Sequence, residues 1–329
     1  MKIDFLTVLI AVFALLIMTI PGFIFGKLKI MPEKSAETCS KIVMYCCQTA
    51  LAFNIFASKT YTSEIGKNML IVFGLAVGLH LLMAILLQVF VRSKSDRATI
   101  IKNAGYLGNC GFMGIPFLQM LFGNGNNDVL IYAAVIIVVF NLFNWTLGVF
   151  TISGDKKQIS VKKILLNPVI IAIILGFVLF VTVQKPFVQI LPEGTVWHSI
   201  LEKVLLAIEA FSDMVTPLSM FVIGLRLSTV SLKQLFLDKD AYLVCLIKLI
   251  LMPMITILVV AFLPVSNMVK YAIFLMLAMP SATSTSLFAV MYDKESNFST
   301  VCVLLTTVLS IITIPVMFLV MSGLFGVVI

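Results

Sequence analysis

The chain has 329 residues, of which 61% are apolar and only 12% are charged, and its mean hydropathy is +1.13. Soluble proteins are about half apolar and about a quarter charged, so this composition excludes a cytosolic protein. The net charge of +8 does not indicate nucleic-acid binding, because the Lys and Arg residues lie between apolar runs and form no basic stripe with interleaved aromatics. We therefore expect a chain that lies mostly in the lipid bilayer, without a nucleic-acid partner.

Long apolar runs follow one another along the whole chain. A helix that crosses a bilayer needs about 20 apolar residues, and lipid admits only helices or closed barrels. The weak alternation of barrel strands is absent from these runs. The sequence predicts an all-α polytopic membrane protein with ten transmembrane helices, near residues 5–26, 38–57, 68–91, 99–122, 129–152, 165–184, 203–227, 241–263, 269–291 and 299–326.

The positive charges are distributed unequally between the two sides of the predicted bundle. The loops after spans 1, 3, 5, 7 and 9 carry 14 Lys and Arg residues, and the opposite side carries six. The positive-inside rule then places the loop near 153–164 in the cytoplasm and both termini outside. We expect a multi-pass protein of the plasma membrane with this orientation.

The two halves of the chain resemble each other. In span 4 a glycine recurs every third residue from Gly105 to Gly114 and Pro116 follows, while span 9 contains Met279-Pro280-Ser281. Thr49 and Pro116 are 67 residues apart, and Thr216 and Pro280 are 64 apart. This spacing predicts a duplication of five helices, 1–152 and 165–329, joined by the short loop. Since five is odd, the second repeat must be inverted.

Both matched positions favour a broken helix. A proline in mid-helix removes a hydrogen bond and clashes with the preceding turn, and glycines ease unwinding. If spans 4 and 9 break near Pro116 and Pro280 and cross, two half-helix N-termini point into one site, which suits an anion. The alternative is a simple proline kink in each helix, with glycines for close packing. Recurrence at matched positions favours the break.

Polar side chains accompany both predicted breaks. Five hydroxyls follow Pro280, and they either bind substrate or an ion or return hydrogen bonds to helix carbonyls. Asn109 precedes the first break, and two amides in span 5 share one helix face, as do two hydroxyls in span 10. We expect these faces to meet the crossover, and the alternative for the amides is a role as interhelical hydrogen bonds. The side chains are Ser281, Thr283, Ser284, Thr285, Ser286, Asn141, Asn144, Thr307 and Ser310.

Charges inside spans are costly and therefore informative. Span 7 holds Glu209 and Asp213 on one face, and span 8 holds Lys248. We consider them candidates for proton or sodium coupling, with Asp213 foremost. The alternative is a structural ion pair between Asp213 and Lys248.

Enzymatic chemistry finds no support in the sequence. The two histidines, His80 and His198, belong to no HExxH or GxSxG motif, and no GxxxxGK[ST] loop indicates ATP hydrolysis. The six cysteines fall in predicted spans without a CxxC pair, so neither disulfides nor a metal site are indicated. We expect neither catalysis nor a cofactor.

Two motifs resemble a known family. Residues 108–116, GNCGFMGIP, followed by residues 141–148, NLFNWTLG, are similar to the span 4 and span 5 signature of the auxin efflux carrier family, which includes PIN-type carriers and bacterial malate or malonate permeases. Residues 217–220, PLSM, leading to Gly224, resemble span 7 of that family. The resemblance extends over essentially the full length. Ala50 stands where family members often have proline, and a long central loop is absent, which favours the bacterial permease type.

The resemblance implies a fold similar to that of the bile acid:sodium symporters. Helices 1, 2, 6 and 7 would form a scaffold, and helices 3–5 and 8–10 a moving transport core, commonly in a homodimer. Gly111, Gly114, Pro116, Asn141, Asn144 and Pro280 would carry over as site residues. The chain is thus expected to be a secondary transporter of small organic anions that works by an elevator movement. The alternative is an anion channel or a non-transporting membrane receptor on the same fold.

Overall fold

The computed structural model describes residues 5–32, 34–123 and 128–325. The described chain is helical throughout, apart from connecting turns. The helices of the first half are α1 (Phe5–Lys27), α2 (Ser35–Ile42), η1 (Val43–Cys47), α3 (Gln48–Ala57), α4 (Ser63–Phe90), α5 (Asp96–Tyr106), η2 (Cys110–Gly114), α6 (Ile115–Phe122), α7 (Val129–Phe143), η3 (Asn144–Gly148) and α8 (Val149–Ser153).

The second half continues with helices of similar length. The short elements η4 and η5 are 3₁₀ turns, and η6, like η1, η2 and η3, is a π-helical turn. The helices are η4 (Lys156–Gln158), α9 (Val161–Leu165), α10 (Pro168–Val183), η5 (Phe187–Ile190), α11 (Val196–Asp213), α12 (Val215–Ser228), α13 (Leu232–Leu237), α14 (Lys239–Leu246), η6 (Ile247–Leu251), α15 (Met252–Ala261), α16 (Asn267–Leu277), α17 (Thr283–Met291) and α18 (Ser296–Phe325).

Seven of the described helices are long and apolar enough to cross a bilayer, and α9 with α10 forms an eighth candidate that is bent by 45°. Two shorter apolar helices, Cys110–Phe122 and Asn267–Leu277, overlap the predicted spans 4 and 9. The prediction of an all-α polytopic membrane protein is confirmed. The count of ten spans stays a prediction, because the two broken regions are too short to pass as single spanning helices.

Local sequence explains where many helices start. Thr62 and Ser95 accept hydrogen bonds from backbone N–H groups in the first turns of α4 and α5, and Ser266 does the same for α16. Pro168 occupies the first turn of α10, where its missing N–H costs nothing. These caps satisfy donors that a helix start leaves free. The caps therefore set where these helices begin, and the apolar faces of the helices determine how they pack against one another.

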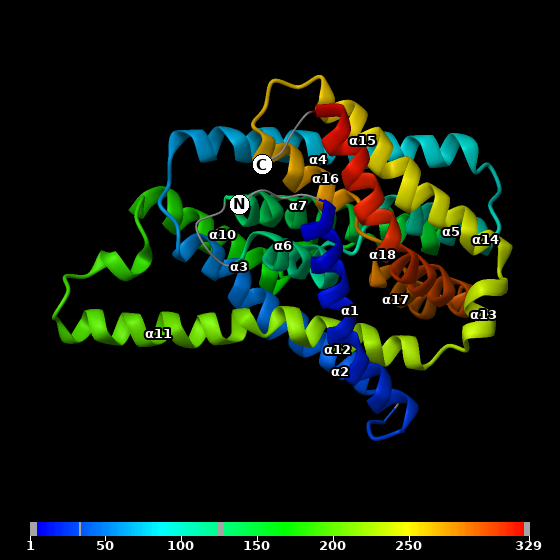
Figure 1. Cartoon of the computed structure of the whole chain (residues 1–329), viewed down its shortest axis with the longest axis horizontal. Helices are drawn as coiled ribbons and strands as arrows, with labels where there is room; N and C mark the ends of the chain where they lie inside the picture. Colours follow the sequence, from blue (N-terminus) through cyan, green and yellow to red (C-terminus); the bar gives the residue numbers. More distant parts are fainter. Residues whose placement is uncertain (1–4, 33, 124–127, 326–329) are drawn as a thin grey trace.

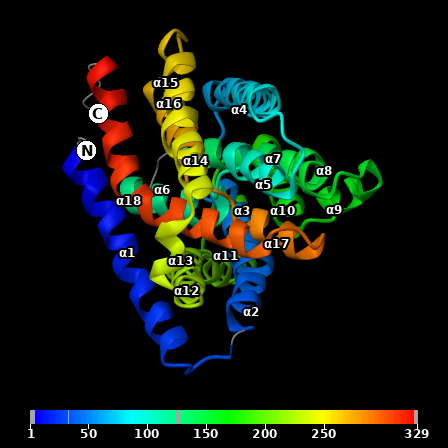
Figure 2. The same ribbon diagram turned by 90° about the vertical axis from the view of Figure 1, so that its right-hand side faces the viewer.

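The long helices frame the shorter ones. Figure 1 shows α4 along one side of the molecule and α11 with α12 along the other, with the short helices α5, α6, α16 and α17 between them. Helix α1 packs along α12, and α3 packs against both α10 and α11. Figure 2, turned by 90°, shows α1 and α18 on the face that lies away from α8 and α9.

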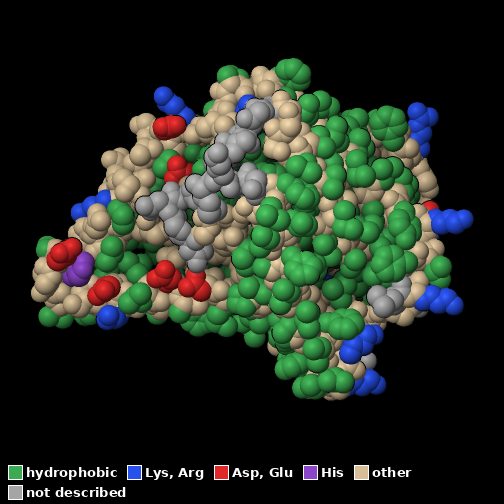
Figure 3. All heavy atoms as spheres, in the orientation of Figure 1, with side chains coloured by type: hydrophobic (Ala, Val, Ile, Leu, Met, Phe, Trp, Pro, Cys, Tyr) green, Lys and Arg blue, Asp and Glu red, His purple; other side chains and the backbone are tan. Residues whose placement is uncertain are grey.

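Charges lie toward the ends of the long axis. Figure 3 shows hydrophobic side chains over the middle of the visible face, Lys and Arg along its right-hand edge, and most of the acidic side chains at the left. An apolar middle flanked by charged ends is what a bilayer requires.

The tight packing of α1 against α12 depends on two glycines. A Cβ atom on Gly224 would overlap the backbone of Thr19, and one on Gly22 would overlap the backbone of Phe221. Small residues let helix backbones approach closely in lipid. Gly224, part of the family-like motif, is thus a packing residue of this seam.

Candidate functional site

Two broken spans meet in the middle of the fold. Helix α5 ends at Tyr106 and η2 begins at Cys110, while α16 ends at Leu277 and α17 begins at Thr283. An antiparallel bridge joins Gly108 to Ser281. The backbone N–H of Asn109 donates to the Pro280 carbonyl at 2.7 Å, and that of Ala282 donates to the Leu107 carbonyl at 3.0 Å. We call this meeting point, residues 107–109 and 278–282, the crossover.

The break at Pro280 is confirmed, but the expected position of the first break near Pro116 is wrong. The chain leaves the helix at Leu107–Asn109, and Pro116 lies in the first turn of α6. The π-helical turn η2 and α6 form one helical segment, Cys110–Phe122, so Pro116 lies within a helix that continues past it. The predicted glycine-rich stretch, not the proline, is the segment that unwinds.

Side chains of the second break bind to the first span. The Ser281 hydroxyl donates to the Ala104 carbonyl at 2.9 Å, and its backbone N–H donates to the Thr306 hydroxyl at 3.2 Å. Thr285 donates to the Asn103 side-chain oxygen at 2.8 Å, and the Asn103 amide donates to the Gly148 carbonyl at 2.9 Å. All of these side chains are buried. They connect α5, η3, α17 and α18 around the crossover.

Other buried polar atoms have no hydrogen-bond partner in the described structure. A buried polar group without a partner is rare and calls for an explanation. At the crossover, Asn109 Nδ2 is such an atom. Buried polar atoms without a partner also occur in the predicted spans 2, 5, 7 and 9. They are Gln48 Nε2, Asn144 Oδ1, Ser219 Oγ, Ser284 Oγ and Ser286 Oγ.

Gln48 connects α3 with the first break. A Cβ atom on Gly111 would lie 2.9 Å from Gln48 Nε2. Gly111 therefore leaves room for an amide that comes from another span. Gly114 does the same for Met276, whose sulfur would lie 2.8 Å from a Cβ atom there. Both glycines singled out from the sequence are sites of close approach.

The predicted polar faces of spans 5 and 10 have different roles. The Asn141 side chain donates to the Ile137 carbonyl and accepts from Asn167 at 3.2 Å, whereas Asn144 begins the π-helical turn η3. Thr307 and Ser310 donate to carbonyls of their own helix. The role of these two hydroxyls at the crossover stays a prediction; the hydroxyl that contacts Ser281 is that of Thr306, one position earlier.

Lys248 lies next to the crossover. Its side chain is fully buried, and its Nζ donates to the Leu277 carbonyl at 3.1 Å. A Cβ atom on Gly108 would lie 3.1 Å from that nitrogen. Lys248 belongs to the π-helical turn η6, a kind of helix distortion that is frequent at functional sites.

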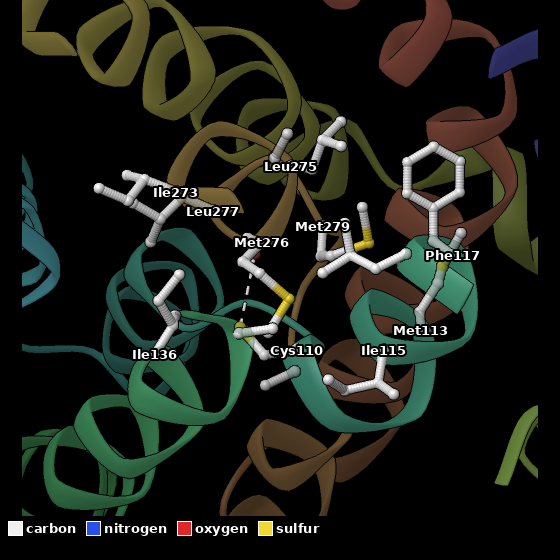
Figure 4. Close-up of a cluster of buried hydrophobic side chains, with 14 of the residues drawn as sticks. Cys110, Met113, Ile115, Phe117, Ile136, Ile273, Leu275, Met276, Leu277 and Met279 are labelled. Carbon is white, nitrogen blue, oxygen red and sulfur yellow. Dashed lines mark hydrogen bonds between the residues drawn. The ribbon is translucent and has the colours of Figure 1, made fainter. Parts of the chain in front are cut away.

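Figure 4 shows the apolar packing around Cys110 and Met276, next to the crossover. The Cys110 thiol donates to the Met276 carbonyl at 3.4 Å. Buried aliphatic and sulfur-containing side chains surround this contact, among them Ile136, Ile273, Leu277 and Met279. Electrostatic interactions are strong in surroundings of this kind, because little water screens them.

Glu209 and Asp213 lie elsewhere. Both are exposed, and they line a cavity of about 60 Å³ with Lys59 and Gln119, between α3, α6 and α11. The ion pair between Asp213 and Lys248 is not among the ion pairs of the described residues, and Lys248 instead donates to the Leu277 carbonyl. In the loop after α3, burial lowers the pKa of Lys59, and Asp128 opposes that shift.

Sequence reasoning missed several residues of the site. Gln48, Asn103 and Gln119 are amides inside or beside apolar spans, and the Thr216 hydroxyl donates to Gln119 at 2.8 Å. Their polarity within apolar runs was a usable signal. In the described chain, no group of three or more His, Cys, Asp or Glu side chains could hold a metal ion.

Comparison with known proteins now identifies the family. The family model described as membrane transport protein matches residues 7–162 and 156–318, nearly the whole chain. No curated protein matches the chain. The residues matched include both broken spans and Lys248 between them. The chain belongs to the membrane transport protein family, the auxin efflux carrier or PIN-like family that its motifs resemble.

Proposed function

We propose that this membrane transport protein is a secondary transporter of small organic anions, and that its substrate binds at the crossover. The substrate class is mono- or dicarboxylates, such as malate or malonate, or auxin-like acids. The observation that carries the proposal is the backbone pairing of the two breaks through Gly108 and Ser281. Unwound backbone in a membrane is tolerated where it lines a binding site or is covered by protein.

The charges of the half-helices favour an anion. Two helical segments, η2 with α6 and α17, begin at the crossover. The N-terminus of a helix carries about half a positive charge and unpaired N–H groups. Asn109 Nδ2 and Gln48 Nε2 add free amide donors, and Ser284 and Ser286 add free hydroxyls. Amide and hydroxyl donors of this kind bind carboxylates.

The packing supports an elevator movement of one group of helices along another. Helices α1, α3, α10, α11 and α12 contact one another and would form the scaffold, with the remaining spans as the transport core. Polar contacts between the groups are isolated, such as Thr216 with Gln119 and Asn167 with Asn141. Isolated contacts can be exchanged as the core moves. We propose ten helices in two inverted repeats, and a homodimer formed through the scaffold.

The direction of transport depends on whether a cation is co-transported with the anion. Moving one negative charge across 100 mV corresponds to about 2.3 kcal/mol, so an anion leaves a cell passively and needs compensation to be accumulated. We propose a location in the plasma membrane with both termini outside. Glu209 and Asp213, in their cavity with Lys59, would face the outer side of the scaffold.

Uptake into proteoliposomes tests the proposal. The purified chain is reconstituted and supplied with a panel of radiolabelled mono- and dicarboxylates and indole acids, under imposed potentials and ion gradients. We expect saturable flux of at least one carboxylate that unlabelled substrate inhibits. Flux that rises linearly with concentration would indicate the channel alternative, and absence of flux for every anion would exclude the transporter.

A further inference from the structure

Arg226 is a basic side chain near the end of α12 that forms no ion pair with any described residue. Its Nε is buried and makes no hydrogen bond. The hydrogen bond that the guanidinium does make is long, from Nη2 to the Ser40 hydroxyl of α2 at 3.4 Å. A guanidinium matches the geometry of phosphate and carboxylate groups, which accept two of its N–H groups at once. The side chain is therefore available to an oxyanion.

Glu37 of α2 does not neutralise this charge. The two side chains interact electrostatically, but the Glu37 carboxylate pairs with Lys41, one turn later on the same helix, at 2.7 Å. Lys34 also lies close enough to Glu37 to interact with it. Three basic side chains thus share one carboxylate among the described residues, and this end of the scaffold keeps an excess of positive charge.

Helices α1 and α2 and the loop between them surround the end of α12. A Cβ atom on Gly26, at the end of α1, would overlap the Ser228 hydroxyl. Met31, in the loop, packs against the buried cluster that contains Val222. Val222 lies four residues before Arg226 and therefore on the same face of α12. The loop between α1 and α2 thus passes beside the guanidinium.

Basic and apolar side chains are exposed together on this loop. Leu28 is 67% exposed and Ile30 is 58% exposed, and Lys27, Lys29 and Lys34 are exposed beside them. Figure 1 shows the loop at the lower edge of the molecule, and Figure 3, in the same orientation, shows basic and hydrophobic side chains next to each other at that edge. Apolar side chains that alternate with lysines are typical of a segment that lies between lipid tails and headgroups.

We propose that Arg226 and the three loop lysines form a binding site for the phosphate headgroup of an anionic phospholipid. The guanidinium takes two phosphate oxygens, the lysines add electrostatic attraction, and the acyl chains lie against the exposed apolar side chains of the loop. In the orientation proposed above, this end of the bundle meets the cytoplasmic leaflet, which carries the anionic lipids. The bound lipid would hold the ends of α1, α2 and α12 together.

The test measures which lipids the purified chain retains. Native mass spectrometry follows the protein in detergent with equal amounts of phosphatidylglycerol and phosphatidylcholine, and the wild type is expected to retain phosphatidylglycerol preferentially. Arg226→Gln is expected to lower that retention about fivefold, the factor that one basic residue contributes at an anionic surface. Arg226→Lys is expected to recover part of it, because lysine keeps the charge and loses the fork of N–H groups. The matched control is Arg92→Gln, since Arg92 is exposed and its Nε donates to the Val89 carbonyl at 3.2 Å.

A second variant serves if Arg226→Gln does not fold. Replacing Lys27, Lys29 and Lys34 together by Gln changes exposed side chains only, and it is expected to lower retention of phosphatidylglycerol and to leave that of phosphatidylcholine unchanged. In a separate arm, inorganic phosphate is added to the complex of the wild type with phosphatidylglycerol. The lipid is expected to stay bound, because its acyl chains contribute contacts that free phosphate lacks.

Three results would overturn the inference: equal retention of the two lipids by the wild type, unchanged retention of phosphatidylglycerol in Arg226→Gln or in the triple lysine variant, or full displacement of the lipid by inorganic phosphate, which would assign the site to a soluble oxyanion. Because lipid retention is measured without transport, absence of carboxylate flux would contradict the proposed function and leave this inference standing.

Discussion

The two broken spans meet through matching backbone hydrogen bonds, yet different side chains support them. At the second break, the Ser281 side chain donates to Ala104, and its backbone donates to Thr306. At the first break, the amide nitrogen of Asn109 has no partner, and Gly111 leaves space that Gln48 of another span approaches. Matched positions in the two halves have thus acquired unequal polar environments.

The difference separates side chains that stabilise the fold from side chains that are available to bind a ligand. A buried hydroxyl with a partner stabilises the fold, whereas a buried donor without one is available to a ligand. We therefore expect substitution of a partnered side chain, such as Ser281, to lower stability, and substitution of an unpartnered donor, such as Asn109, to lower transport. Four variants test that division, from the largest expected effect to the smallest.

Gly111→Leu is expected to abolish uptake. The first side-chain atom would already lie 2.9 Å from Gln48 Nε2, and the rest of leucine would fill the space between α3 and η2. Reconstituted uptake of the carboxylate measures the effect. Gly74→Leu on α4 is the matched control, because nothing lies within 4 Å of a Cβ atom there. Wild-type uptake by Gly111→Leu would show that this space is not part of the transport path.

Ser281→Ala is expected to lower the free energy of unfolding by about 1–3 kcal/mol, the cost of leaving a buried carbonyl without its partner. The carbonyl concerned is that of Ala104. Unfolding in detergent, followed by circular dichroism, gives the value. Ser286→Ala removes a buried hydroxyl that has no partner and should change stability far less. Equal losses for the two variants would contradict the structural role of Ser281.

Asn109→Ala is expected to raise KM about tenfold, or about 1.4 kcal/mol in binding free energy, and to leave the unfolding temperature unchanged. The reason is that its amide nitrogen makes no hydrogen bond in the fold. Asn68→Ala is the opposite case, because Asn68 donates to the Tyr132 hydroxyl at 3.0 Å. That control should lose stability and keep its KM. If Asn109→Ala were less stable and kept a normal KM, Asn109 would stabilise the fold and would not bind the substrate.

Thr216→Val is expected to have the smallest effect, about 0.6 kcal/mol in stability, as is usual for hydrogen bonds between transmembrane helices. It removes the 2.8 Å contact with Gln119 that joins α12 to α6. If α6 moves past α12 during transport, the maximal rate changes while KM does not. Thr182→Val serves as control, since Thr182 bonds only within α10. A change in KM alone would place Thr216 in the binding site.

Much of the architecture follows from the sequence because lipid imposes strict rules. Apolar runs of spanning length had to be helices, and the Met279-Pro280-Ser281 segment had to interrupt one of them. The family-like motifs around Gly111 and Asn141 indicated the family that the chain belongs to. The position of the first break was less visible, because glycines permit unwinding without fixing where it occurs, and Pro116 is accommodated within the helical segment Cys110–Phe122, directly after a π-helical turn.

What the tertiary structure alone decided is which residues meet. Residues 108 and 281 are far apart in sequence, and their pairing depends on how the two halves pack. The choice of Thr306 over Thr307 depends on how α18 is rotated about its own axis when it packs against the second break. The separation of Lys248 from Asp213 has the same origin. The sequence by itself determined a helical membrane transporter with an interrupted helix in each half, because hydrophobicity and backbone chemistry are local; the partner of each polar side chain was decided by packing, because hydrogen bonds act only at contact distance.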